Sequence, residues 1–115
     1  MTRIMLAAAA VTAAVFAANA TAATPKLTGL VADPVKISLT QGGKKVTKVK
    51  AGKYTIVVKD TASDHNFHLT GPGVNKSTSV AGEGTSTWTV TLKKGTYKFV
   101  CDPHSSFMKG SFTVS

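Results

Sequence analysis

The dominant pattern beyond residue 23 is an alternation of apolar and polar side chains with a period of two. It is clearest in residues 35–40 and 87–92, where every second side chain is apolar. This is the period of a strand with one buried face, and no segment beyond residue 22 has the period of an amphipathic helix. We therefore expect short strands joined by turns.

Further strands are indicated where β-branched and aromatic residues gather. We expect them in residues 27–31, 54–58, 96–101 and 110–114. Glycine-rich turns at 41–43 and 71–73 separate strands, residues 93–95 carry a hairpin signal, and residues 27–31 suit an edge strand. About seven to eight such strands predict an all-β fold, an antiparallel Greek-key β-sandwich.

The first 22 residues have the composition of a secretory signal peptide. Arg3 supplies a positive charge, residues 4–18 are a run of small apolar side chains, and small residues at 18–22 allow cleavage. The run is short for a membrane-spanning helix of about 20 residues, which favours cleavage over retention as an anchor. We therefore expect an exported protein, periplasmic or extracellular. Its mature part, residues 23–115, should be one domain without stable membrane insertion.

Lysine dominates the charged residues of the mature part. Without Arg3 the chain has 13 Lys against five acidic residues, a formal charge of +8. Such a charge favours acidic partners. The lysines are dispersed and the chain has a single Trp, so the pattern does not indicate a nucleic-acid surface. We interpret the five lysines in residues 44–53 as a solvated edge rather than a dedicated docking patch.

Three metal-binding side chains lie within eight residues near the C-terminus. Cys101, His104 and Met108 offer a thiolate, an imidazole and a thioether, donors that suit copper. Cys101 is the single cysteine, and metal ligation explains an unpaired thiol in an exported protein. An electron-transfer copper site needs a second imidazole, which His65 or His68 can supply. In an extended segment these two point to opposite faces, so only one easily reaches the metal.

Residues 95–104 resemble the G-x-Y-x-F-x-C-x-P-H strand and loop of small blue-copper proteins, the plastocyanin, pseudoazurin and amicyanin branch of the cupredoxins. Residues 108–110 are similar to the M-x-G return strand of that family, and residues 65–66 to its H-N pair. The resemblance covers nearly the whole mature domain and implies a cupredoxin-like sandwich that binds copper.

The resemblance also implies a ligand set and its support. The four ligands of one type 1 copper ion would be His65, Cys101, His104 and Met108. The Asn66 side chain would hydrogen-bond to the segment after the cysteine and tie the two ligand segments together. The H-N pair favours His65 over His68. The interval from His104 to Met108 is intermediate between the amicyanin-like and plastocyanin-like loops, so the axial bond length is left open.

The expected function is one-electron transfer by copper that cycles between Cu(II) and Cu(I). We expect a monomer that makes transient contacts with acidic redox partner proteins. The same ligands would also serve an extracytoplasmic protein that delivers or sequesters copper. Catalysis is disfavoured, because no orienting Asn or Asp other than Asp102 accompanies the Cys101 and His104 pair. Three histidines also cannot furnish a multicopper cluster.

Overall fold

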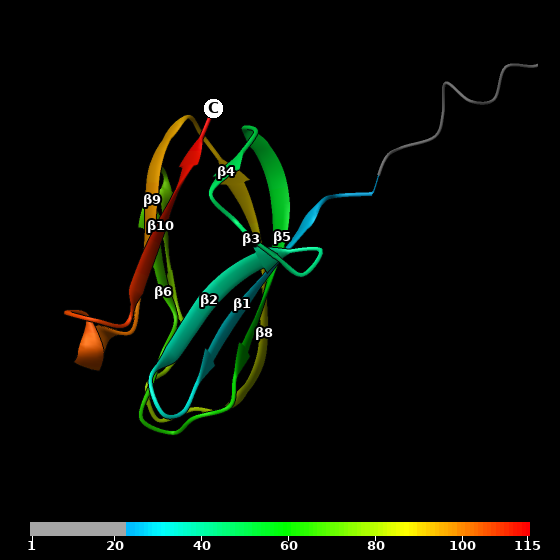
Figure 1. Ribbon diagram of the computed structural model, residues 1–115. Helices are drawn as coiled ribbons and strands as arrows, with labels where there is room; N and C mark the ends of the chain where they lie inside the picture. Colours follow the sequence, from blue (N-terminus) through cyan, green and yellow to red (C-terminus); the bar gives the residue numbers. More distant parts are fainter. Residues whose placement is uncertain (1–22) are drawn as a thin grey trace, which may run out of the picture.

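Ten strands in two sheets make up residues 23–115, the part of the chain that the computed structural model describes (Figure 1). The strands are β1 (Lys26–Ala32), β2 (Lys36–Gln41), β3 (Lys44–Lys45), β4 (Lys48–Val49), β5 (Gly52–Asp60), β6 (His68–Gly71), β7 (Val74–Ser77), β8 (Gly84–Leu92), β9 (Gly95–Val100) and β10 (Lys109–Val114). One sheet has the order β3-β2-β1-β5-β8 and the other β4-β10-β9-β6-β7. The predicted all-β sandwich is confirmed. The strand count exceeds the expected seven to eight, and β3 and β4 have only two residues each.

Within residues 23–115 the chain forms no α-helix. Its helical turn is a 3-10 helix, Asp102–His104, in the loop between β9 and β10. No helix in this part of the chain is long and apolar enough to cross a membrane. The predicted signal peptide, residues 1–22, lies outside the described residues.

The core lies between the inward faces of the two sheets, and the period-two alternation produces it. In β5 every second side chain of residues 54–60 is buried. Aromatic rings fill the layer: Phe67 stacks on Phe99 with ring centroids 5.4 Å apart, and Tyr97 stacks on Phe112 at 5.3 Å. Full burial of a side chain such as Phe67 contributes about 1.5–3 kcal/mol, which anchors the segment that precedes β6.

Two expectations about strand placement are wrong. β1 is not an edge strand: it lies between β2 and β5, and its Leu27 side chain is fully buried. The turn at 93–95 does not close a hairpin, because β8 pairs with β5 in one sheet whereas β9 pairs with β6 and β10 in the other. The Tyr97 side chain forms two hydrogen bonds near this crossover between the sheets. Its hydroxyl accepts from the Lys93 N–H (2.9 Å) and donates to the Pro72 carbonyl oxygen (2.7 Å).

The sheets are mixed rather than wholly antiparallel. β1 runs parallel to β5 and β4 runs parallel to β10, because the chain passes through the opposite sheet between each pair. Val35, expected in a strand, is exposed in the turn between β1 and β2. β7 and the start of β8 carry no strand signal in the sequence, because their mostly polar side chains have no apolar period.

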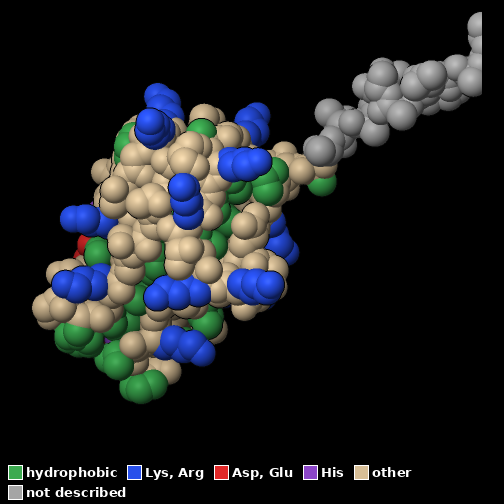
Figure 2. Space-filling model, turned by 45° about the horizontal axis from the view of Figure 1, so that its top comes forward, with side chains coloured by type: hydrophobic (Ala, Val, Ile, Leu, Met, Phe, Trp, Pro, Cys, Tyr) green, Lys and Arg blue, Asp and Glu red, His purple; other side chains and the backbone are tan. Residues whose placement is uncertain are grey.

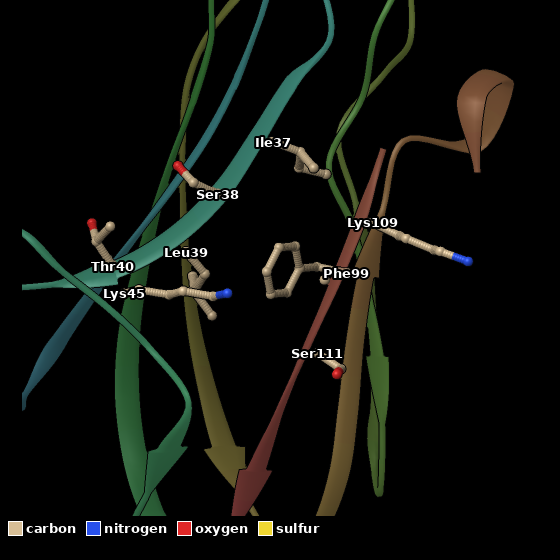
Figure 3. Close-up of a pocket in the computed structure, with 9 residues that line it drawn as sticks. Ile37, Ser38, Leu39, Thr40, Lys45, Phe99, Lys109 and Ser111 are labelled. Atoms are coloured by element: carbon tan, nitrogen blue, oxygen red, sulfur yellow. The ribbon is translucent and has the colours of Figure 1, made fainter. Parts of the chain in front are cut away.

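A groove of about 530 Å³ opens along one side of the sandwich (Figure 3). In it, the Phe99 ring points from β9 toward Ile37 and Leu39 of β2, and Lys45 and Lys109 also line the groove. None of the four predicted copper ligands lines this groove. It is therefore separate from the predicted metal centre.

Candidate metal centre

The loop between β9 and β10 brings three of the predicted ligands together by local contacts, and it projects from the ends of these strands (Figure 1). The Cys101 N–H donates to the Met108 carbonyl oxygen (2.9 Å). The N–H groups of His104 and Met108 donate to the carbonyl oxygens of Cys101 (3.0 Å) and His104 (2.8 Å), respectively. The loop therefore closes on itself, with Cys101 and Met108 buried and His104 partly exposed.

The connection between β5 and β6 supplies His65, whose side chain is only 1 % exposed. Its Nε2–H donates to the carbonyl oxygen of Pro34 (2.8 Å), and a carboxylate oxygen of Asp33 lies 3.1 Å from the same nitrogen. Because Nε2 carries the proton, Nδ1 keeps its lone pair. Metal-binding histidines are commonly oriented in this way, with the other ring nitrogen donating to a carbonyl or carboxylate oxygen.

Three donor atoms from these two segments form a triangle. His65 Nδ1 lies 3.1 Å from His104 Nδ1, and Cys101 Sγ lies 3.7 and 3.5 Å from these nitrogens, respectively. The point equidistant from all three atoms is about 2.0 Å from each, close to the ~2.0–2.1 Å of zinc–nitrogen and ~2.3 Å of zinc–sulfur bonds. The triangle therefore has the size of a three-coordinate site for a first-row transition metal.

Met108, the predicted axial ligand, is buried and follows two of the triangle's residues closely in the sequence. Its main chain is bonded to both Cys101 and His104. A thioether added to one thiolate and two imidazoles completes the donor set of a type 1 copper site. The residues present thus fit a single copper ion, and the assignment of each ligand remains a prediction.

Asn66 ties the two ligand segments together, as the family resemblance implies. Its Oδ1 accepts from the main-chain N–H of Asp102 (2.7 Å), and its Nδ2 donates to the Asp102 carboxylate (2.8 Å). Asn66 is buried, whereas the Asp102 side chain is 49 % exposed, so the bonds lie where the ligand segments reach the surface. The residue after His65 is therefore fixed to the residue after Cys101.

His68 points away from the donor triangle. Its Nδ1 lies 2.9 Å from a carboxylate oxygen of Asp102, and its Nε2 lies 2.7 Å from Asn75 Oδ1. The hydrogen bond with Asp102, helped by the one with Asn75, raises the pKa of His68 above its ordinary 6.5. Of the two candidate upstream histidines, only His65 lies in the cluster with Cys101 and His104.

Sequence reasoning missed two contributors to the centre. Pro34 orients His65 from 31 positions away through a carbonyl oxygen, which leaves no trace in a side-chain pattern. The role of the Asp102 carboxylate was also missed, although alternation offered a signal. Residues 66 and 68 share one face of an extended segment, and both reach Asp102.

Comparisons with known proteins agree with this fold. A family model described as "Cupredoxin-like domain" matches residues 5–114. Reduced rusticyanin aligns at 20% identity over 84% of this chain and 82% of its own, with a TM-score of 0.61. Rusticyanin from Thiobacillus ferrooxidans aligns at 20% identity over 83% and 79%, with a TM-score of 0.57. A further structure, described as the copper protein rusticyanin, aligns at 18% identity over 83% and 80%, with a TM-score of 0.61. No curated protein sequence matches.

Proposed function

Since this chain belongs to the cupredoxin-like domain family, we propose that it carries single electrons on one type 1 copper ion. The observation that carries the proposal is the triangle of one sulfur and two nitrogen atoms with sides of 3.1, 3.5 and 3.7 Å. A bound copper ion would supply the Cu(II)/Cu(I) couple. The fold match to a structure described as a copper protein supports the same metal.

The chain's own contribution is a set of donors that stay in place. His65, Cys101 and His104 would hold the copper ion, with the thioether of Met108 as a further, weaker donor. The hydrogen bonds within the β9–β10 loop and the Asn66 link hold these side chains on a packed sandwich. Donors that move little when the charge of the metal changes keep the reorganisation small, which favours rapid electron transfer.

His104 offers the route between the metal and the surface. Unlike His65, it is partly exposed, and its ring lies 5.5 Å from that of Phe107, centroid to centroid. Phe107 is 58 % exposed, so an apolar contact surface adjoins the exposed imidazole. We propose that electrons enter and leave through His104 during brief contacts of small area.

Lysine side chains would steer the partner. All 13 lysines of the described residues are exposed, and Figure 2 shows Lys side chains scattered over the face in view with little acidic surface between them. A dispersed positive field accelerates encounters with acidic proteins and weakens as salt is added. We therefore propose a monomer that meets acidic redox partners transiently. The N-terminal composition supports export to the periplasm or the extracellular space.

A non-catalytic carrier is proposed over an enzyme and over a copper-delivery protein. The three histidines and one cysteine of the sequence suffice for one mononuclear site, and multicopper oxidase chemistry needs further clusters. Electron self-exchange of the copper-loaded protein tests the carrier directly, alongside the rate at which copper passes to an apo acceptor. Rapid self-exchange with retained copper is expected. Sluggish exchange with ready copper transfer would instead establish delivery or sequestration.

A further inference from the structure

The His68 side chain contacts Asp102, the residue that follows the predicted cysteine ligand. One ring nitrogen contacts both carboxylate oxygens of Asp102, at 2.9 and 3.1 Å, and the other contacts Asn75 Oδ1 at 2.7 Å. Both nitrogens therefore face oxygen acceptors, and only the doubly protonated imidazolium has a proton for each. The His68 side chain is 25 % exposed and that of Asp102 49 %, so the ion pair lies at the surface, partly open to solvent.

This contact continues a strand pairing beyond the point where the main-chain ladder ends. The last pair between β6 and β9 is His68 with Val100. Two residues further along this register, the Asn66 side chain accepts from the main-chain N–H of Asp102 and donates to its carboxylate, in place of ladder bonds. Asp102 is thus held through its N–H and both carboxylate oxygens, directly next to Cys101.

We propose that His68 is a positioning residue of the copper centre: its cationic ring fixes the Asp102 carboxylate, and through it the Cys101 end of the ligand loop. The inference rests on the proposed copper site and adds a role for a histidine that is not a ligand. It has two consequences. The ring keeps the Cys101 thiol shielded in the apoprotein, and its charge offsets the negative charge of Asp102 beside the thiolate.

Loss of the positive charge of His68 should lower the reduction potential of the copper centre. Without the His68 cation, the Asp102 carboxylate adds uncompensated negative charge near the metal. Negative charge favours the more positive Cu(II) over Cu(I), so the reduction potential falls. Because the ion pair is partly exposed to solvent, the change in the Cu(II)/Cu(I) affinity ratio should be modest, about threefold.

The test compares His68→Gln with Lys98→Gln. Lys98 stands in β9 two residues before Val100, on the same outer face, so its substitution removes one positive charge without touching Asp102. In the apoprotein, the rate at which a disulfide reagent modifies the fully buried Cys101 should rise about threefold for His68→Gln and stay unchanged for Lys98→Gln. In the copper-loaded protein, the potential should fall more for His68→Gln than for Lys98→Gln, whose exposed charge is screened by solvent.

A third variant shows whether the effect passes through Asp102. In an Asp102→Asn background, His68→Gln should leave the apoprotein thiol rate nearly unchanged, because the ion pair through which the ring acts on the loop is already gone. Equal thiol rates and equal potentials for His68→Gln and Lys98→Gln would overturn the inference. Failure of the unsubstituted protein to form a blue copper complex would overturn the proposed function instead, and the apoprotein thiol rate would still decide whether His68 positions the loop.

Discussion

The two segments that meet at the candidate copper centre are held in place by different kinds of contact. Residues 101–108 close on themselves through main-chain hydrogen bonds within the loop. His65, in contrast, is oriented by Pro34, 31 positions away, and its neighbour Asn66 is bonded to Asp102, 36 positions away. The C-terminal loop can therefore form from local geometry, whereas the His65 segment needs the complete sandwich. The donor triangle exists only when both are in place.

Removal of a donor from either segment should have the largest effect. Cys101→Ser and His65→Ala each take away one corner of the triangle, so we expect both to abolish the intense visible absorption of the Cu(II)-loaded protein. The main-chain bonds of the loop do not depend on the cysteine sulfur. The matched control is His68→Ala, which should retain the absorption. Optical and paramagnetic-resonance spectra measure this, and a blue His65→Ala protein would refute the assignment of the upstream ligand.

Loss of the hydrogen bonds between Asn66 and Asp102, which link the two ligand segments, should have the next largest effect. Asn66→Ala leaves the Asp102 N–H without its partner and removes a buried side chain, so we expect the free energy of unfolding to fall by about 2–3 kcal/mol. Urea unfolding of the apoprotein measures the change. Asn75→Ala, at an exposed residue bonded to His68, serves as the control and should cost less than about 1 kcal/mol. Equal losses would show that Asn66 does not join the segments.

Asp60, the last residue of β5 and the start of the connection to His65, is a buried acid that should destabilise the fold at neutral pH. Asp60 is only 4 % exposed, and its Oδ2 has no hydrogen-bond partner among the described residues. Burial, with a smaller contribution from Glu83, raises the pKa of Asp60 above its ordinary 3.8. Because the folded pKa exceeds the unfolded one, stability falls as the pH rises from 3.8 through the folded pKa.

Asp60→Asn should therefore raise the free energy of unfolding at pH 7 by about 1 kcal/mol, since a neutral amide is less costly to bury than a carboxylate. The gain should shrink as the pH falls toward 3.8. Urea unfolding across this pH range checks it, with the exposed Asp64→Asn as a control that should show little change. A loss of stability at pH 7 would mean that the ionised Asp60 is needed by the segment.

The smallest effect should be the pH dependence of the stability that the ion pair of His68 and Asp102 contributes next to Cys101. Partial burial acts to raise the pKa of Asp102, but hydrogen bonds from Asn66 and His68 outweigh it and leave the pKa below 3.8. The pKa of His68 is raised above 6.5. The stability from Asp102 is thus present above pH 3.8 and lost as the pH falls through its folded pKa, whereas that from His68 is complete below pH 6.5 and lost as the pH rises through its folded pKa.

The pair should therefore stabilise the apoprotein most between about pH 4 and 6.5, by less than about 1 kcal/mol because Asp102 is half exposed. Unfolding curves for the unsubstituted protein and His68→Gln should differ in this window and converge above the folded pKa of His68. A constant difference up to strongly alkaline pH would show that the stabilisation does not depend on the positive charge of His68.

The contrast between local and remote contacts also explains what the sequence could predict. Period-two alternation was enough for the two-sheet sandwich, and the spacing from Cys101 to Met108 was enough for the local loop. The Asn66 link followed from the family resemblance and is present in the structure. The edge position expected for residues 27–31 and the hairpin expected at 93–95 are wrong, because the choice between neighbouring strands is made by packing across the whole domain rather than by the turn itself.

The orientation of His65 was beyond prediction for the same reason. Its partner is a main-chain oxygen of Pro34 in a turn between two other strands, and any residue there has such an oxygen. His68 could be separated from His65 by alternation alone, but its partner Asp102 becomes visible only when β6 and β9 are paired.

Titration of the purified apoprotein with Cu(II), followed by visible absorption and paramagnetic resonance, shows whether the chain binds copper in a type 1 site. The triangle of His65, His104 and Cys101 predicts saturation at one copper ion per chain, an intense band from the thiolate and the spectrum of a type 1 site. A colourless complex, or one with the spectrum of a tetragonal site without sulfur, would show that Cys101 does not bind the copper ion.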